Sequence, residues 1–459
     1  MTQISNKSVT ETLAEWVVST RFEDVPEAGV VRVRERFIDT LGVACAGMSV
    51  STGRIMAEWV RQQGARGDST VLGADFTTSA SYAALANAAA GHALEYDDIA
   101  VGSGHFANPM TAATLAFGEK IGASGKDVIL GWMVGYEIIA QTAKVTADPG
   151  GNTLLNRGWF NQGFLPAVAV AAAASRMSGL DVMQTRMAMG HAASTMAGML
   201  KNRGSDTKGF VAGNAAMHGI MAAELVALGF TANDEIMDGE LGVARLLSFQ
   251  TRDAGMMLDG LGDWTMATLG STLRLHACCG ASHWAQDALQ KIVHSHSFSH
   301  DQIATIEVEF PGMLHQFMPY SRPQTGLEAK YSLEYGLVAI ALDGRAGLHQ
   351  YSDAAVQRPE ARALMERIDV RPMSDGPMRS RVVVKLTNGD VFEETANRAH
   401  GNPSDPLTRE EVAGKFHECA EELMPLQQRE QVINLCNQLD RIGNVRELGS
   451  ALQIARPAS

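Results

Sequence analysis

The chain has 459 residues, 46% of them hydrophobic and 19% charged, which is the balance of a globular protein long enough for two domains. Its formal net charge of -13 argues against a nucleic-acid partner and against an anionic membrane surface, because both carry the same sign of charge. The N-terminus has no apolar signal core, no run reads as long and apolar enough to span a bilayer, and the five cysteines have no zinc-site spacing. We therefore expect a cytoplasmic protein with reduced thiols and with no nucleic-acid or membrane partner.

The first half of the chain has the apolar periodicity of helices almost without interruption. In the first helix Leu13, Trp16 and Val17 fall on one stripe, and Ser124-Gly125 separates two later helices. A short extended segment is expected at 69–72. The predicted helices cover residues 8–20, 26–46, 55–63, 78–95, 110–122, 126–146, 162–177, 181–199 and 208–228.

The pattern changes after about Thr268. Residues 303–310 alternate apolar and polar side chains and predict a strand, and Asn388-Gly389 inside 381–394 predicts a hairpin with a type I′ turn. Further helices are expected at 281–295, 328–343, 408–422 and 427–439. We therefore predict a mainly α protein: a large discontinuous helical-bundle domain, residues 1–268 and 401–459, with a smaller α+β lid domain, residues 269–400, inserted.

The stretch from Ala86 to Pro109 concentrates ionisable side chains between apolar helices. The three-residue spacing of His92, Glu95 and Asp98 would place them roughly on one helix face at the end of the helix predicted over 78–95, and a glycine-broken turn leads on to His105. A solvated helix end with capping acids is one interpretation. The apolar flanks favour the other, in which these groups line a cleft, because burying them unpaired is costly.

Two polar loops precede later helices. The loop 157–163, with Phe160, Asn161 and Gln162, enters a helix whose first backbone N–H groups can bind an anion, although an ordinary interhelical loop fits equally well. Lys208 lies where the next helix opens. A cation there opposes the helix dipole, which favours a role in carboxylate binding or proton transfer.

Two further clusters lie in the second half of the chain. Cys278 and Cys279 follow Arg274 in the sequence. One of the two could be a reactive thiolate, or both could be small buried hydrophobic residues. Residues 330–335 form a polar entry to an apolar helix, where capping is the simplest role and a tyrosine that reaches a cleft is another. The chain has no P-loop and no strand-linked dinucleotide-binding motif.

Together these motifs resemble the MmgE/PrpD family, which includes 2-methylcitrate dehydratase, cis-aconitate decarboxylase and iminodisuccinate epimerase. The resemblance covers essentially the whole chain. It implies a discontinuous helical domain, an inserted α+β lid, a cleft between them, and a homodimer without a cofactor. The motifs that carry it are Gly91–Asp98 with His105, Thr207-Lys208 before Gly213–Ala216, Arg274–His283, and Lys330–Tyr335 followed by Leu342–Gly344.

The resemblance also assigns roles to residues of this chain. The family's catalytic positions fall on Glu95, where many members have Asp, and on His105, Lys208 and the lid-helix tyrosine Tyr335. The positions expected to bind the substrate are Asp98, Phe160, Asn161, Gln162, Arg274 and Cys279.

Three of these positions depart from the family pattern. Phe160 stands where dehydratases and decarboxylases often have His, and Arg274 replaces the lysine before the cysteine pair. Cys279 stands where one decarboxylase branch has His, although other members have cysteine. These changes keep a positive pocket but remove candidate acid–base groups.

The function expected is that of a cofactor-independent lyase, a dehydratase or decarboxylase, acting on a small di- or tricarboxylate by proton transfer next to a carboxylate. Lys208 and Arg274 would stabilise the charge that builds on the carboxylate, and His105 would be the acid or base. An isomerase or epimerase of a dicarboxylate is the first alternative. The others are a non-catalytic carboxylate-binding protein and a metal-dependent hydratase that uses Glu95, Asp97, Asp98 and His105 as ligands; the leading hypothesis needs no metal.

Overall fold

The computed structural model describes residues 7–100, 104–146, 154–248, 253–373 and 379–454. Within it the chain divides into two compact units. Unit 1 comprises residues 1–93, 97–271 and 412–459, and unit 2 comprises residues 94–96 and 272–411. Leu94–Tyr96 thus belongs to unit 2 by its contacts, although the chain on both sides of it belongs to unit 1.

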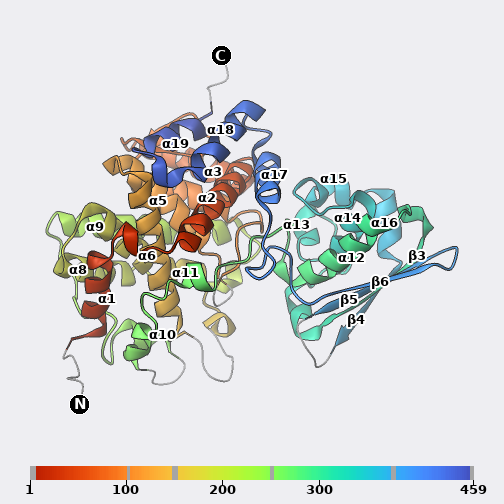
Figure 1. The fold of residues 1–459 in the computed structure, drawn as a ribbon, viewed down its shortest axis with the longest axis horizontal. Coiled ribbons are helices and arrows are strands. Elements are labelled where there is room, and N and C mark those ends of the chain that lie inside the picture. Colours follow the sequence, from red (N-terminus) through yellow and green to blue (C-terminus); the bar gives the residue numbers. More distant parts are fainter. Residues whose placement is uncertain (1–6, 101–103, 147–153, 249–252, 374–378, 455–459) are drawn as a thin grey trace. The chain divides into compact units, whose positions relative to one another are not determined.

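Unit 1 is almost entirely helical (Figure 1), and the predicted mainly α class is confirmed. The nine helices expected in the first half of the chain correspond to α1 through α9. A two-stranded ladder of β1 (Ser69–Thr70) and β2 (Thr77–Thr78) is antiparallel. The helices of the first segments are α1 Val9–Ser19, α2 Glu27–Met48, α3 Ser51–Gln63, α4 Ala80–Gly91, α5 Ala107–Ile121, α6 Gly125–Ala143, α7 Leu165–Ser178, α8 Val182–Ala193, α9 Asp206–Ala227, α10 Val243–Leu247 and α11 Thr265–Thr268.

Helices α4 and α9 pack with their backbones close together. A Cβ atom added at Gly213 of α9 would lie 2.3 Å from Leu85 O of α4, and one added at Gly209 would lie 2.6 Å from Ala89 O. Side chains larger than hydrogen would therefore push the two helices apart. This contact brings the C-terminal end of α4 beside the first turn of α9, and both ends carry candidate site residues.

The C-terminal helices are α17 (Arg409–Ala420), α18 (Leu426–Asn437) and α19 (Arg446–Leu452). From Val412 onward they belong to unit 1, where α18 packs on α2 and α19 on α5. Lys415 Nζ lies 2.6 Å from Asp39 Oδ1 of α2, and both side chains are buried. Burial raises the pKa of Asp39, and the Lys415 charge opposes that rise. Removing either partner would leave a buried charge, so the pair fixes α17 against α2.

The expectation that no segment could span a bilayer needs one correction. Helix α9 is long and apolar enough by length and composition, with a mean hydropathy of 1.3 over its best window. More than half of that window is buried inside the structure, where α9 packs against α4, α7 and α8. Its composition is therefore that of a central core helix.

Unit 2 combines a mixed sheet with helices. The strand order is β4-β3-β5-β6; β3 pairs with β4 in parallel and with β5 antiparallel, and β5 pairs antiparallel with β6. Helix α12 packs on β5 and β6 (Figure 1). Sequence analysis missed β4: Ile368 to Arg371 alternate apolar and polar residues, but the run is short, contains Pro372, and has no fully buried side chain. The elements are β3 Ile303–Pro311, β4 Ile368–Met373, β5 Ser380–Leu386, β6 Val391–Ala396, α12 His283–Ser295, α13 Gly326–Ala329, α14 Leu333–Asp343, α15 Asp353–Val356 and α16 Pro359–Met365.

The hairpin between β5 and β6 is confirmed, but its turn is not type I′. Gly389 has φ +93°, whereas Asn388 is not among the residues with positive φ. Gly389 N–H donates to Leu386 O at 3.0 Å, and Leu386 N–H donates to Asp390 O at 2.8 Å. A type I′ turn needs positive φ at both central residues. Here only Gly389 has it, which is typical of a longer hairpin loop that ends in one left-handed residue.

Candidate active site

The structure contradicts the expected shared helix face of His92, Glu95 and Asp98. Helix α4 ends at Gly91, and Glu95 has a left-handed backbone with φ +55°. A non-glycine residue in that conformation is uncommon and costs about 1–2 kcal/mol. Residues 92–98 therefore form a strained irregular segment in place of two more helical turns.

The helix stops because side-chain cations bind the carbonyl oxygens that further helical turns would need. Each carbonyl of a continuing helix accepts a backbone N–H four residues later. In this segment three of them accept from lysine or arginine. These bonds are Lys208 Nζ to His92 O at 3.3 Å, Lys330 Nζ to Leu94 O at 2.5 Å, and Arg274 Nη1 to Glu95 O at 2.7 Å.

In unit 1, His105 is oriented through its Nδ1 atom. That atom lies 2.5 Å from the backbone oxygen of Asp98 and 3.6 Å from Asp97 Oδ1. A carbonyl oxygen can only accept, so Nδ1 carries the hydrogen and Nε2 carries the lone pair of the neutral ring. This is the tautomer required of a general base that acts through Nε2.

His92 and Asp97 form a buried pair beside His105. His92 Nδ1 lies 2.6 Å from Asp97 Oδ2, and neither side chain is more than 1% exposed. The His92 ring centroid lies 5.1 Å from that of His105 and 5.7 Å from that of Phe160. Phe160, predicted to bind substrate, thus packs on one imidazole of the cluster. Its apolar ring supplies no acid or base.

Asp98 makes two separate contacts: its backbone oxygen binds His105, and its carboxylate binds the start of α5. Its Oδ1 accepts the Ala107 N–H of α5 at 3.1 Å. Burial and the nearby Asp97 charge raise the pKa of Asp98 to about 7, while Arg36 and hydrogen bonds from Ser271 and Ala107 act against that rise. Its carboxyl group anchors the segment to the start of α5 while its carbonyl oxygen holds His105.

Lys208 lies in the first turn of α9 and is 8% exposed. Its ammonium group donates to His92 O at 3.3 Å. The ammonium charge and the positive end of the α9 dipole have the same sign, so together they create a buried positive region next to the His92–His105 cluster. Lys208 and His105 thus both contact the segment that follows α4, Lys208 through His92 O and His105 through Asp98 O.

Asn161 and Gln162 form the short 3₁₀ helix Asn161–Gly163, directly before α7. Both side chains are buried, at 4% and 1% exposure. Among the described residues, neither the amide oxygen nor the amide nitrogen of Gln162 has a hydrogen-bond partner. An amide buried in this way costs stability unless a ligand satisfies it. This agrees with the predicted substrate-binding role of Gln162.

In unit 2, Glu95 is held at both carboxylate oxygens. The Tyr331 hydroxyl donates to Oε1 at 2.7 Å, and Arg274 Nη1 lies 3.1 Å from Oε2. Arg274 Nη1 also donates to Cys278 O at 3.1 Å. The Arg274 side chain is 2% exposed. Arg274, predicted to clamp a substrate carboxylate, thus forms an ion pair with a carboxylate of its own chain.

Lys330 and Tyr96 complete the contacts of Leu94–Tyr96 within unit 2. Lys330 Nζ donates to Leu94 O and, at 3.1 Å, to Ala277 O. The Tyr96 hydroxyl donates to Leu275 O at 3.2 Å. Sequence reasoning assigned no catalytic role to Lys330 or Tyr331. The only signal available was their place in a polar stretch before an apolar helix.

Tyr335 lies elsewhere in unit 2. Its hydroxyl donates to Gln350 O at 2.5 Å, and its ring packs against Tyr351 with centroids 5.7 Å apart. Burial raises the pKa of Tyr335 to about 12. The structure shows no contact between Tyr335 and the Glu95 cluster among the described residues. Its catalytic role stays a prediction from the family resemblance.

The cysteine pair lies in surroundings that disfavour a thiolate. Burial raises the pKa of Cys279 to about 11, and Arg274 opposes the rise only in part. Burial also raises the pKa of Cys278, whose Sγ lies 3.2 Å from Gln286 Oε1. Both shifts favour the neutral thiol and thus the interpretation of the pair as small buried hydrophobes.

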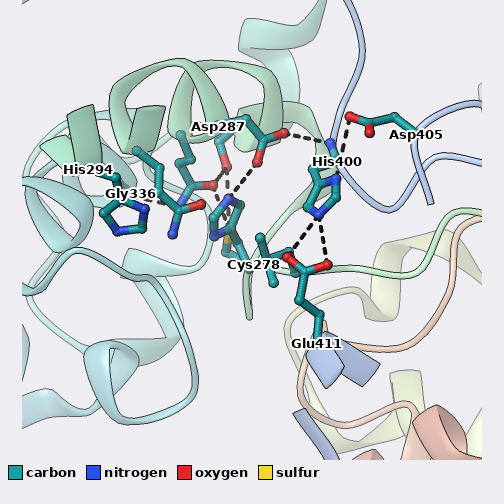
Figure 2. A network of polar contacts seen from close by, with 12 residues as sticks. Cys278, Asp287, His294, Gly336, His400, Asp405 and Glu411 are labelled. Atoms are coloured by element: carbon teal, nitrogen blue, oxygen red, sulfur yellow. Dashed lines mark hydrogen bonds and ion pairs between the residues drawn. The ribbon is translucent and has the colours of Figure 1, made fainter. Parts of the chain in front are cut away.

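A second polar network in unit 2 is shown in Figure 2. Asp287 Oδ1 lies 3.0 Å from His276 Nε2, and Asp287 Oδ2 accepts the His400 N–H at 2.8 Å. His400 Nε2 lies 3.0 Å from Glu411 Oε1, and Nδ1 lies 3.4 Å from Asp405 Oδ2. Within the described ranges, no three His, Cys, Asp or Glu side chains are arranged to hold a metal ion, here or in the cluster of residues 95–105.

Two family models match this chain. The model of the MmgE/PrpD N-terminal domain matches residues 11–254, and that of the MmgE/PrpD C-terminal domain matches residues 276–439. Together they cover most of the sequence, so the protein belongs to the MmgE/PrpD family.

The chain is similar along its length to several cis-aconitate decarboxylases. It is 24% identical to that of Homo sapiens over 472 residues, which cover 98% of this chain and 96% of the relative. It is 24% identical to that of Mus musculus over 451 residues, covering 95% and 91%, and 24% identical to that of Aspergillus terreus strain NIH 2624 over 476 residues, covering 97% and 96%.

Proposed function

We propose that this protein is a cofactor-independent lyase that acts on a small di- or tricarboxylate by moving a proton on the carbon next to a carboxylate. The observation that carries the proposal is the fixed tautomer of His105, whose Nδ1–H is held by Asp98 O. Membership of the family and the similarity to cis-aconitate decarboxylases support the lyase class.

His105 is the proton-transfer group in this mechanism. Its Nε2 lone pair takes a proton from the carbon, and the electron pair of the broken C–H bond moves into the substrate. The resulting imidazolium is stabilised by Asp97, whose Oδ1 lies 3.6 Å from Nδ1. Such a base contributes roughly 10²–10⁴-fold to a rate.

Lys208 stabilises the negative charge that develops on the substrate carboxylate during proton removal. Its ammonium group is buried at the start of α9, so its field is weakly screened. A fixed charge in such a place lowers the barrier because it needs no rearrangement when the anion forms. Gln162 supplies an amide that can bind a further oxygen of the substrate.

An epimerase is the second candidate, and Phe160 is the observation that favours it. Its ring, 5.7 Å from that of His92, occupies a place in the cluster where an acid or base would help to expel water or carbon dioxide. Return of the proton to the opposite face of the same carbon needs no leaving group.

The test is an NMR screen of polycarboxylates, cis-aconitate among them, in deuterated water with metal-free protein and EDTA present. A decarboxylase releases carbon dioxide and places a deuteron from the solvent on the product, whereas a dehydratase loses the carbon-bound proton and the hydroxyl group as water and accumulates an unlabelled alkene. An epimerase incorporates deuterium and gives a diastereomer of the same mass apart from the isotope. Activity that requires an added divalent metal would contradict the cofactor-independent mechanism, and the absence of both deuterium exchange and product would indicate a carboxylate-binding protein without catalysis.

A further inference from the structure

We propose that Tyr331 is a positioning residue of this reaction: together with Arg274 it holds the Glu95 carboxylate ionised and in one orientation, so that Glu95 serves as a second proton-transfer group. The inference rests on the proposed function, because a lyase or epimerase must both remove a proton and deliver one. It differs from the sequence-based expectation, which placed the functional tyrosine at 335.

The hydrogen bonds on Glu95 are the first argument. Tyr331 donates to Oε1 at 2.7 Å and Arg274 donates to Oε2 at 3.1 Å, so both oxygens of the carboxylate are oriented by side chains of unit 2. Hydrogen bonds donated to a carboxylate favour its ionised form. When Glu95 accepts a proton, a substrate C–H bond breaks, an O–H bond forms on the carboxyl group, and the electron pair stays on the substrate.

The backbone of Glu95 is the second argument. Its φ of +55° is one of two positive values at non-glycine residues in the described ranges. Strain of this kind persists only where the surroundings enforce it. Lys330 holds Leu94 O and Arg274 holds Glu95 O, so the strained conformation and the two carboxylate contacts come from one set of unit 2 side chains.

The other titratable groups of unit 2 near Glu95 do not replace Tyr331. Cys279 interacts with Glu95 electrostatically, but burial keeps its thiol neutral. Lys330 is bound to Leu94 O and Ala277 O. Tyr331 is therefore the hydroxyl group whose removal changes Glu95 most directly.

The direct experiment is a titration that does not depend on activity. Protein labelled with ¹³C at the glutamate carboxyl carbon is titrated by NMR, and the Glu95 resonance is assigned by its loss in Glu95→Gln. In Tyr331→Phe, we expect its titration midpoint to move to higher pH, because one hydrogen bond to the ionised form is gone. Tyr82→Phe is the matched control. Tyr82 lies in unit 1 and packs on Trp59, and the same change there should leave the resonance unmoved.

Kinetics supply the second readout. We expect Tyr331→Phe to lower kcat about 10- to 100-fold, the effect of a lost hydrogen bond to a charged group, and to move the acid limb of the kcat/KM profile to higher pH with little change in KM. In a double-mutant cycle, Tyr331→Phe should have almost no further effect in Glu95→Gln protein.

An unmoved Glu95 resonance in folded Tyr331→Phe protein would overturn the inference, as would equal effects of that substitution with and without Glu95. A loss of melting temperature without a change in the pH profile would mean a purely structural tyrosine and would also overturn it. Wild-type protein inactive on all polycarboxylates would contradict the proposed function instead, while the NMR titration would still decide whether Tyr331 controls Glu95.

Discussion

His105 is held by a backbone carbonyl oxygen, which fixes its tautomer but supplies no charge. Asp97 supplies the charge from 3.6 Å away, and the main chain of Asp98 supplies the orientation. The two tasks that one carboxylate performs in many acid–base pairs are therefore divided between neighbouring residues of one segment. The proton-transfer role of His105 and the charge-stabilising role of Lys208 can be tested by separate substitutions.

We expect His105→Gln to lower kcat about 10²–10⁴-fold with little change in KM, because the amide can keep polar contacts but cannot accept the proton. Lys208→Ala should lower kcat/KM about 100-fold or more, since a buried charge that stabilises the transition state is lost. Steady-state kinetics and melting curves measured on the same samples check both. Near-normal kcat in well-folded His105→Gln protein would leave Glu95 as the base.

Glu95 allows a test of backbone strain separate from its carboxylate. Glu95→Ala and Glu95→Gly both remove the buried ion pair with Arg274, which should cost about 3–5 kcal/mol in each case. Glycine tolerates φ +55°, whereas alanine does not, so the Gly variant should be more stable by about 1 kcal/mol. Urea unfolding measures the difference. An alanine variant as stable as the glycine variant would show that the positive φ carries no strain.

At the scale of elements, the start of α17 depends on an ionisable network. Glu411 accepts the Thr408 N–H at 2.8 Å and contacts His400, which also faces Asp405. Partial burial lowers the pKa of His400, but the contacts with Glu411 and Asp405 outweigh it, and the pKa ends above the usual histidine value. The pKa of Glu411 is below its usual value, because hydrogen bonds from Thr408 and His400 outweigh partial burial.

These shifts predict how stability depends on pH. A raised His400 pKa contributes stability that is complete below the unfolded value of about 6.5 and is lost as pH rises through the folded value. The melting temperature of wild type minus that of His400→Gln should therefore be largest near pH 6 and shrink toward pH 9. Melting curves across that range decide it, and Lys385→Gln, which changes an exposed pair on the sheet, serves as the control. A difference in melting temperature that does not change with pH would show that the charge of His400 does not stabilise this region.

At the scale of the whole molecule, the division into units differs from the division into family models. The C-terminal model runs to residue 439, past Glu411, where unit 2 ends. Leu94–Tyr96 belongs to unit 2 although the N-terminal model covers it. Sequence models follow the order of the chain, whereas compact units follow its contacts.

The homodimer expected from the family resemblance is a prediction for the intact chain. Sedimentation velocity at micromolar concentration should give twice the 49.1 kDa of one chain. Unit 1 carries large apolar side chains that are well exposed in one copy, among them Leu228, Leu241 and Leu246, and apolar surface of this kind is often covered by a partner. A monomer at all concentrations tested would contradict the prediction. The cytoplasmic location and a cleft between the two domains likewise stay predictions.

Local sequence patterns predicted the helices and the hairpin that the structure contains, and they supplied the candidate site residues. Apolar periodicity is a local signal, and helices such as α1 and α2 are the local response to it, so their bounds were predicted to within a few residues. The family motifs named Glu95, His105, Lys208 and Arg274 because residue type and spacing are also local.

Tertiary structure decided where α4 ends and what Glu95 contacts. Lys208, Lys330 and Arg274 come from positions more than a hundred residues further along the chain, yet their ammonium and guanidinium groups bind the carbonyl oxygens that local periodicity assigns to a helix. The same long-range contacts place Tyr331 on Glu95 and Tyr335 on Gln350. No local pattern distinguishes those two tyrosines, because the choice depends on which side chains fold back onto residues 92–98.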